Sequence, residues 1–130
     1  MATAADLIGA WELERWAPVP DDGGPAAFPL GEDARGLILY TPDGHVSAML
    51  ARAVATGEGP FGDAFAYAGR VEVRDGAVFH SIRVSTDPAL VGVTSTRRIA
   101  LSGDRLTLSG PDFSTGTGRT QRIDWRRARP

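Results

Sequence analysis

Hydrophobic and polar residues alternate along several short segments of the chain. Trp11 and Leu13 alternate with glutamates, and Ile123 and Trp125 alternate with charged residues. Successive side chains of a β-strand point to opposite faces, so such segments predict strands with one apolar and one polar face. The pattern predicts eight strands, at about 9–17, 35–41, 45–51, 67–74, 77–85, 91–101, 105–109 and 119–127.

Three turn sequences separate neighbouring apolar segments. They are TPDG at 41–44, RDGA at 74–77 and LSGDR at 101–105, and each places Gly beside Asp. These residues accept the backbone angles of tight hairpin turns. Eight short strands joined in this way predict an all-β fold, an eight-stranded antiparallel barrel that forms a single domain over residues 1–130.

Two segments rich in Pro and Gly, 17–34 and 52–65, predict long loops, the second with a helical turn near 62–66. The strand segment at 36–40, GLILY, is apolar on both faces. An exposed apolar face needs a cover. We expect either the preceding loop or a partner subunit, as in a homodimer, to cover it.

Composition narrows the classes of partner. The net charge of −2 argues against a nucleic acid or an anionic membrane as partner. No apolar segment approaches the ~20 residues that span a bilayer, and the first residues do not resemble a signal peptide. The absence of cysteine fits a cytoplasmic protein. All fourteen basic residues are arginines, which is typical of a bacterial genome with high GC content and excludes Schiff-base catalysis.

The alternation of inward and outward positions along each strand, called strand parity here, places few polar side chains inside the barrel. The inward set is Tyr67, His80, Ser95, Arg97 and Gln121, with Arg15 near a strand end. None of the carboxylates falls on an inward strand position, which argues against paired-carboxylate catalysis. The two histidines have no companions at ligand spacing, so neither a metal nor a cofactor is expected.

His80 is then the inward side chain expected to titrate near neutral pH. Counting from the turn at 74–77, Tyr67 lies about four residues beyond the partner of His80. That is roughly 13 Å, too far for contact unless a bulge shifts the register. Arg97 on the next strand would lie near either residue. The structural alternatives are a hydrogen-bonded core histidine, and an arginine that stacks on Trp11 or Trp125.

Five segments that cover nearly the whole chain follow one another in a known order. They are LIGAWELERW, FPLGEDARGLILYTPDGHVSAML, YAGRVEV, VFHSIRVSTDPALVG and LSGDRLTLS. In these segments the chain resembles the bacterial and fungal lipocalin-like domain family. It departs at Ser81, where relatives often carry a second His, and in STDPALVG, where an aromatic commonly precedes Val-Gly. The resemblance implies a small calycin-type barrel. Related barrels include small-molecule carriers and cyclases.

The inward residues and the resemblance together favour an enzyme without a cofactor. It would be a cyclase or isomerase acting on a hydrophobic, polyketide-like secondary metabolite, with His80, Tyr67 and Arg97 polarising a carbonyl or moving a proton. The ligand-binding candidates are Tyr40, Met49, Ser95, Gln121, Trp125 and Trp11. The alternatives are a carrier that sequesters the same class of ligand, and a barrel filled by its own side chains.

Overall fold

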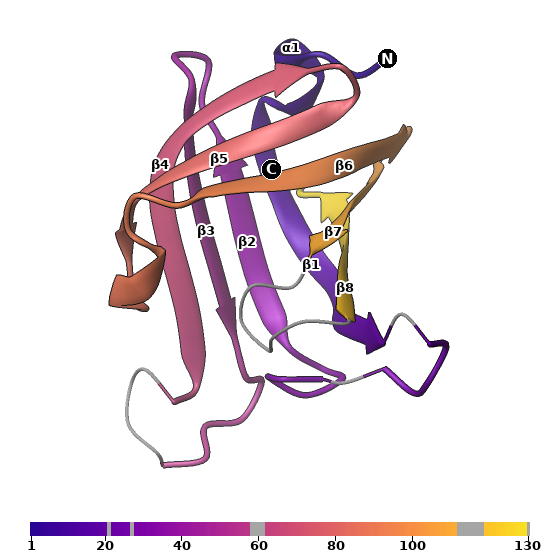
Figure 1. Cartoon of the computed structure of the whole chain (residues 1–130), viewed down its shortest axis with the longest axis vertical. Helices are drawn as coiled ribbons and strands as arrows, with labels where there is room; N and C mark the ends of the chain where they lie inside the picture. The colour runs from indigo at the N-terminus through magenta and orange to yellow at the C-terminus, as the bar shows by residue number, and fades with distance from the viewer. Residues whose placement is uncertain (21, 27, 58–61, 112–118, 130) are drawn as a thin grey trace.

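The computed structural model describes residues 1–20, 22–26, 28–57, 62–111 and 119–129. The chain forms a closed antiparallel barrel in which every strand pairs with its neighbours in sequence and the last strand pairs with the first (Figure 1). The elements are α1 (Ala4–Leu7), β1 (Gly9–Pro20), β2 (Arg35–Tyr40), β3 (His45–Ala51), β4 (Ala64–Arg74), β5 (Ala77–Ser85), η1 (Pro88–Leu90), β6 (Thr94–Ser102), β7 (Arg105–Pro111) and β8 (Arg119–Arg127). The predicted all-β, eight-stranded barrel is confirmed.

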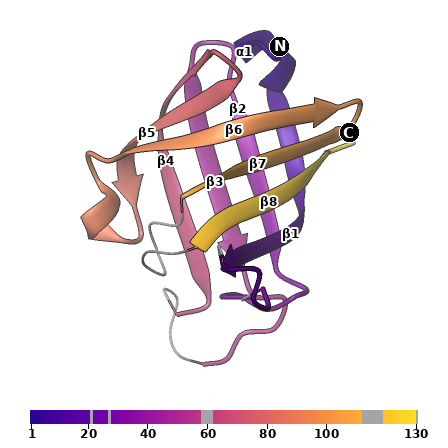
Figure 2. The same cartoon turned by 45° about the vertical axis from the view of Figure 1, so that its right-hand side comes forward.

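The two ends of the barrel differ. The short helix α1 lies at one end, and the segments that follow β1 and β3 lie at the other (Figures 1 and 2). The helix was not predicted, although its signal is local: the Asp6 carboxylate accepts a hydrogen bond from the Thr3 N–H at 2.8 Å. The helical turn expected near 62–66 is wrong, because β4 begins at Ala64 and pairs there with Ala51 of β3.

The expected loop at 17–34 also starts too early. β1 continues to Pro20, and its second half, which contains Pro18 and Pro20, pairs with β8. Pairing between β1 and β2 ends at Glu12, so this second half has a strand neighbour on one side only. Proline lacks an N–H and is tolerated on such an edge.

Two β-bulges reverse the inward and outward positions that strand parity predicts. The first lies in β1 between Leu13 and Arg15, against β8. Beyond it Arg15 is exposed and Trp16 is buried, which corrects the expected inward Arg15. The second separates Ala68 from Gly69 in the pairing of β4 with β5, and beyond it Val84 is 66% exposed. An extra residue in one strand inverts every face that follows it.

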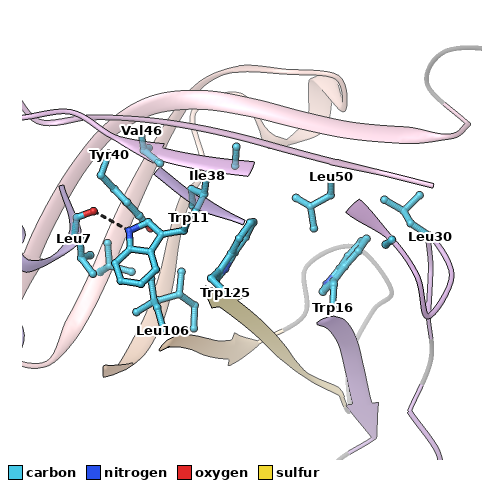
Figure 3. Packing of buried hydrophobic residues seen from close by; sticks show 14 residues of the cluster. Leu7, Trp11, Trp16, Leu30, Ile38, Tyr40, Val46, Leu50, Leu106 and Trp125 are labelled. Carbon is cyan, nitrogen blue, oxygen red and sulfur yellow. Dashed lines mark hydrogen bonds between the residues drawn. The ribbon is translucent and has the colours of Figure 1, made fainter. Parts of the chain in front are cut away.

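A group of buried apolar side chains lies at the end of the barrel that carries α1. Trp11 is fully buried there with Leu7, Tyr40 and Leu106 (Figure 3). The Trp11 indole donates to the Leu7 carbonyl oxygen at 3.0 Å, which joins the helix to β1. Burial of each large apolar side chain contributes about 1.5–3 kcal/mol. Buried side chains of the hydrophobic core therefore close this end of the barrel.

The outer face of β2 and β3 is apolar and exposed. Leu37, Leu39 and Met49 are 47%, 43% and 55% exposed, so the described part of the preceding loop does not cover them as the first alternative expected. Cover by a partner subunit stays a prediction. Among the described residues, no helix has the length and apolar character needed to cross a membrane.

Candidate functional site

A cavity of about 50 Å³ lies inside the barrel. A water molecule needs roughly 10–15 Å³ of such space, so the cavity has room for a few waters, and a larger ligand enters only if the walls move apart. The barrel is therefore not completely filled by its own side chains. The lining residues are Trp16, Ile38, Ala48, Leu50, Phe65, Tyr67, His80, Ile82, Leu90, Val93, Ser95, Arg97, Leu108, Gln121, Ile123 and Trp125.

The polar lining residues lie on β4, β5, β6 and β8, and none of them lies on β2 or β3. Ser95 of β6 pairs directly with His80 of β5, and Arg97 follows two positions later on the same face of β6. Gln121 of β8 and Tyr67 of β4 complete the polar set. The wall built by β2 and β3 is apolar, because its lining residues are aliphatic. The cavity is thus suited to an apolar molecule with polar atoms along one edge.

His80 bridges two tyrosines. The Tyr67 hydroxyl lies 2.8 Å from Nδ1 of His80, and the Tyr40 hydroxyl lies 2.8 Å from Nε2. The sequence places Tyr67 too far from His80 for contact unless a bulge shifts the register. The structure has such a bulge, between Ala68 and Gly69, and the two side chains are in contact. The bulge bends the strands, and the long phenol spans the remaining distance along the interior.

Gly69 makes the bulge sterically acceptable. A Cβ at this position would collide with the carbonyl oxygen of Ser81 on β5. The two backbones therefore approach more closely there than any other residue would permit. This close approach lies between Tyr67 and Val71, the partner of His80, in the two strands that carry the hydrogen-bonded group.

Burial sets the protonation states of this group. Burial first, and the positive charge of Arg97 second, lower the pKa of His80 to about 3. Burial also raises the pKa of Tyr67 to about 12 and raises the pKa of Tyr40 well above its usual range. The expectation that His80 titrates near neutral pH is therefore wrong, because parity shows which face a side chain occupies and not how completely water is excluded.

A neutral imidazole donates through one nitrogen and accepts through the other. One tyrosine therefore donates its proton to His80, and the other accepts from it and keeps its own hydroxyl hydrogen for a further acceptor. Tyr67 lines the cavity and Tyr40 does not. When His80 carries its hydrogen on Nδ1, the Tyr67 hydroxyl is free to donate into the cavity.

The remaining predicted site residues fall into two groups. Ser95, Gln121 and Trp125 line the cavity, and the Gln121 side-chain oxygen accepts a hydrogen bond from the Trp16 indole at 3.0 Å. Trp11 belongs to the closed end, and Met49 lies on the outer face, so the structure brings neither to the cavity. Met49 points outward because its neighbours Ala48 and Leu50 take the inward positions of β3.

In the described part of the chain, no three His, Asp or Glu side chains gather where they could hold a metal ion. The inward groups are instead hydrogen-bond donors and neutral rings, with Arg97 as the cation. Arg97 is 7% exposed and donates from Nη1 to the Thr96 carbonyl oxygen at 3.0 Å. The arrangement can hold an oxygen-bearing apolar ligand and stabilise negative charge on it.

A model of the lipocalin-like domain matches residues 8–128 of this chain. The chain belongs to the lipocalin-like domain family. No curated protein matches it. The fold of the family is that of small-molecule-binding barrels, which agrees with the internal cavity described above.

Solved structures share the fold of this lipocalin-like barrel at low identity. A lipocalin-like protein from Bacteroides uniformis is 17% identical, with a TM-score of 0.55 over 95% of this chain and 99% of that one. An uncharacterized protein from Bacteroides eggerthii is 12% identical, with a TM-score of 0.53 over 93% and 99%. The lipoprotein YedD from Klebsiella pneumoniae is 12% identical, with a TM-score of 0.51 over 97% and 74%.

The stacked arginine of this lipocalin-like barrel is Arg127, which replaces the expectation that Arg97 stacks on Trp11 or Trp125. The Arg127 guanidinium lies 4.1 Å from the ring centroid of Trp11. It also donates to the carbonyl oxygens of Ile8 at 3.0 Å and Asp6 at 2.8 Å. Its place follows from strand pairing, because Arg127 stands directly opposite Trp11 in the register of β1 with β8, and the sequence does not show that register.

Sequence reasoning missed two parts of the cavity of this lipocalin-like barrel. Trp16 was missed because the β1 bulge reverses its face. Leu90 was missed because the strand prediction began at 91, whereas η1 occupies Pro88–Leu90. A local signal was present there: the Asp87 carboxylate accepts from the Ala89 N–H at 3.1 Å, an arrangement typical of the start of a helical turn.

Proposed function

We propose that this lipocalin-like barrel binds a hydrophobic, polyketide-like small molecule and acts on it as a cofactor-independent cyclase or isomerase. One observation carries the proposal. Tyr67, whose hydroxyl is held by His80 at 2.8 Å, lines an otherwise largely apolar cavity that Arg97 also lines. A carrier needs the apolar walls but has no need of such a polarising group.

The proposed chemistry uses position and charge. The apolar walls select a folded conformer of a flexible ligand, and such positioning can supply much of a rate acceleration. Tyr67 donates a hydrogen bond to a ligand carbonyl, and Arg97 stabilises the negative charge that develops on its oxygen. Because His80 is neutral, its role is to orient the Tyr67 hydroxyl rather than to act as a cationic acid.

A second function, a non-catalytic carrier, is favoured by a different observation. Both ring nitrogens of His80 are occupied by tyrosine hydroxyls, and the low pKa removes the imidazole from acid–base chemistry at neutral pH. A barrel that binds its ligand and releases it unchanged would need nothing more than this arrangement.

The test compares turnover with binding in the wild type and in Tyr67→Phe. Linear hydrophobic polycarbonyl compounds are incubated with each protein, the products are separated by liquid chromatography with mass detection, and binding is followed by tryptophan fluorescence. We expect the wild type to accelerate isomerisation or ring closure over buffer. We expect Tyr67→Phe to lower the rate at least 100-fold while its affinity changes less than about threefold.

Met49→Gln is the matched control, because Met49 lies on the outer face and its replacement should leave both readouts unchanged. Ligand recovered unchanged, with equal affinity in the wild type and Tyr67→Phe, would establish the carrier instead. Absence of binding by every hydrophobic compound would contradict both functions.

A further inference from the structure

The polar wall of the cavity is rich in hydrogen-bond donors. Arg97 can only donate. Gln121 already uses its carbonyl oxygen to accept from Trp16, so the amide N–H groups are its other polar atoms. Among the described residues that line the cavity, none is a carboxylate. A ligand edge that meets this wall therefore has to supply acceptors.

Trp125 and Ser95 add a second, independent observation. Trp125 lines the cavity, and its indole nitrogen is buried and has no hydrogen-bond partner among the described residues. Buried N–H groups are normally satisfied, so an unpartnered one on a residue of the cavity wall points to a ligand acceptor. The Ser95 side chain, with 6% exposure, lines the cavity next to His80. Ser95 and Arg97 lie on the same face of β6 and would contact the same edge of a ligand.

The electrostatic potential inside the cavity is positive. The charge of Arg97 lowers the pKa of His80 and acts in the same direction on the pKa of Tyr67 and Tyr40. A positive field favours a ligand that carries negative charge over a neutral one of the same shape, and it disfavours a cation.

We infer that the ligand is an acidic enol, of the enolised 1,3-dicarbonyl class, bound as its anion. Its oxygens lie against Ser95 and Arg97, and its carbon skeleton lies against the aliphatic wall of Ile38 and Leu50. This inference rests on the proposed function, because it concerns the same cavity, and it names the class of substrate. Amines and other cationic ligands are excluded by the donor-rich wall.

Three small rings of similar shape test the inference. Cyclohexane-1,3-dione is an anion at neutral pH, cyclohexanone is neutral and cyclohexylamine is a cation. Each is titrated into the wild-type protein, and the indole N–H resonances are followed by NMR. Trp16 and Trp125 line the cavity and should report binding, while Trp11 lies outside it and serves as an internal reference.

We expect the dione to bind at least tenfold more tightly than cyclohexanone, and cyclohexylamine not to saturate. Ser95→Ala should weaken binding of the dione about three- to tenfold and leave cyclohexanone unchanged. Arg97→Gln should bring the dione and cyclohexanone to within about threefold of each other. The comparison in the wild type tests the inference even when the Arg97 variant does not fold.

Equal binding of cyclohexanone and the dione, with shifts at Trp16 and Trp125, would overturn the anionic ligand and leave the hydrophobic-ligand function standing. Tighter binding of cyclohexylamine would overturn the inference in the same way. If no ring moves those two resonances and the longer polycarbonyl compounds also fail to bind, the proposed function itself is contradicted.

Discussion

His80 shows how far burial can change a single side chain. Parity alone places it inside the barrel, and its unperturbed chemistry would make it a proton carrier at neutral pH. Complete exclusion of water and the charge of Arg97 keep the ring neutral instead. The inward position of His80 was therefore predictable from the sequence. Its protonation state was not, because the pKa depends on how the surrounding strands exclude water.

The low pKa of His80 has a consequence for stability. Its pKa is about 3 in the folded protein and about 6.5 when unfolded, so the unfolded state binds more protons between these values. The contribution is fully present above pH 6.5 and is lost as the pH falls toward 3. We expect the free energy of unfolding of the wild type, measured with urea from pH 7 to 4, to fall more steeply than that of His80→Gln. The difference should approach about 1.4 kcal/mol per pH unit. Parallel slopes for the two proteins would contradict it.

The two tyrosines beside His80 should differ in their effect on stability. Tyr40→Phe leaves Nε2 of His80 without a partner in the core, at a cost of about 1–3 kcal/mol. Tyr67→Phe should cost less, because a water in the cavity can reach Nδ1. Urea denaturation of the two variants at pH 7 measures both values. A larger loss for Tyr67→Phe would show that the cavity does not admit water at this position.

At the scale of the strand, alternation and turn chemistry predicted the elements and missed the bulges. The bounds of β3, β5 and β8 agree with the sequence pattern, because each is framed by turns or by a clear alternation. Trp16 and Val84 were assigned to the wrong face, since a single extra residue leaves no mark in the hydrophobic pattern. For the same reason the contact of Tyr67 with His80 was beyond parity.

Gly69 makes the importance of the second bulge testable. In Gly69→Ala the added methyl meets the Ser81 carbonyl oxygen, so the strands must separate, and we expect a loss of roughly 1–3 kcal/mol in unfolding free energy. Gly24→Ala is the control, because its nearest neighbour atom belongs to the Asp22 side chain, which can move. Thermal and urea unfolding measure both. Equal stability of the two variants would show that the bulge tolerates a side chain.

At the scale of the whole molecule, Arg127 ties the start of the chain to the last strand. It stacks on Trp11 and donates to two carbonyl oxygens that precede β1. From the sequence, the structural alternative for Arg97 was to close the barrel by such stacking, and the structure gives this contact to Arg127 instead. The choice between arginines depended on a register that the sequence does not show.

Loss of this contact should weaken the closed end. We expect Arg127→Ala to lower the unfolding free energy by about 1–3 kcal/mol and to speed hydrogen exchange at the Trp11 indole. Arg126→Ala is the neighbouring control. Its ion pair with Glu14, at 3.6 Å, is partly exposed and should contribute less than about 1 kcal/mol. Similar exchange rates at Trp11 in the two variants would count against a closing role for Arg127.

The pairing of β8 with β1 is the one junction of the barrel that no hairpin makes. Contacts between sequence neighbours form early in folding, whereas this junction joins the two ends of the domain and pays the largest loop entropy. The Trp16–Gln121 hydrogen bond crosses it, and both residues line the cavity. The binding chamber is therefore complete only once this junction has formed. A ligand in the chamber contacts both β1 and β8. We expect such a ligand to slow the separation of these two strands as well as to stabilise the folded state.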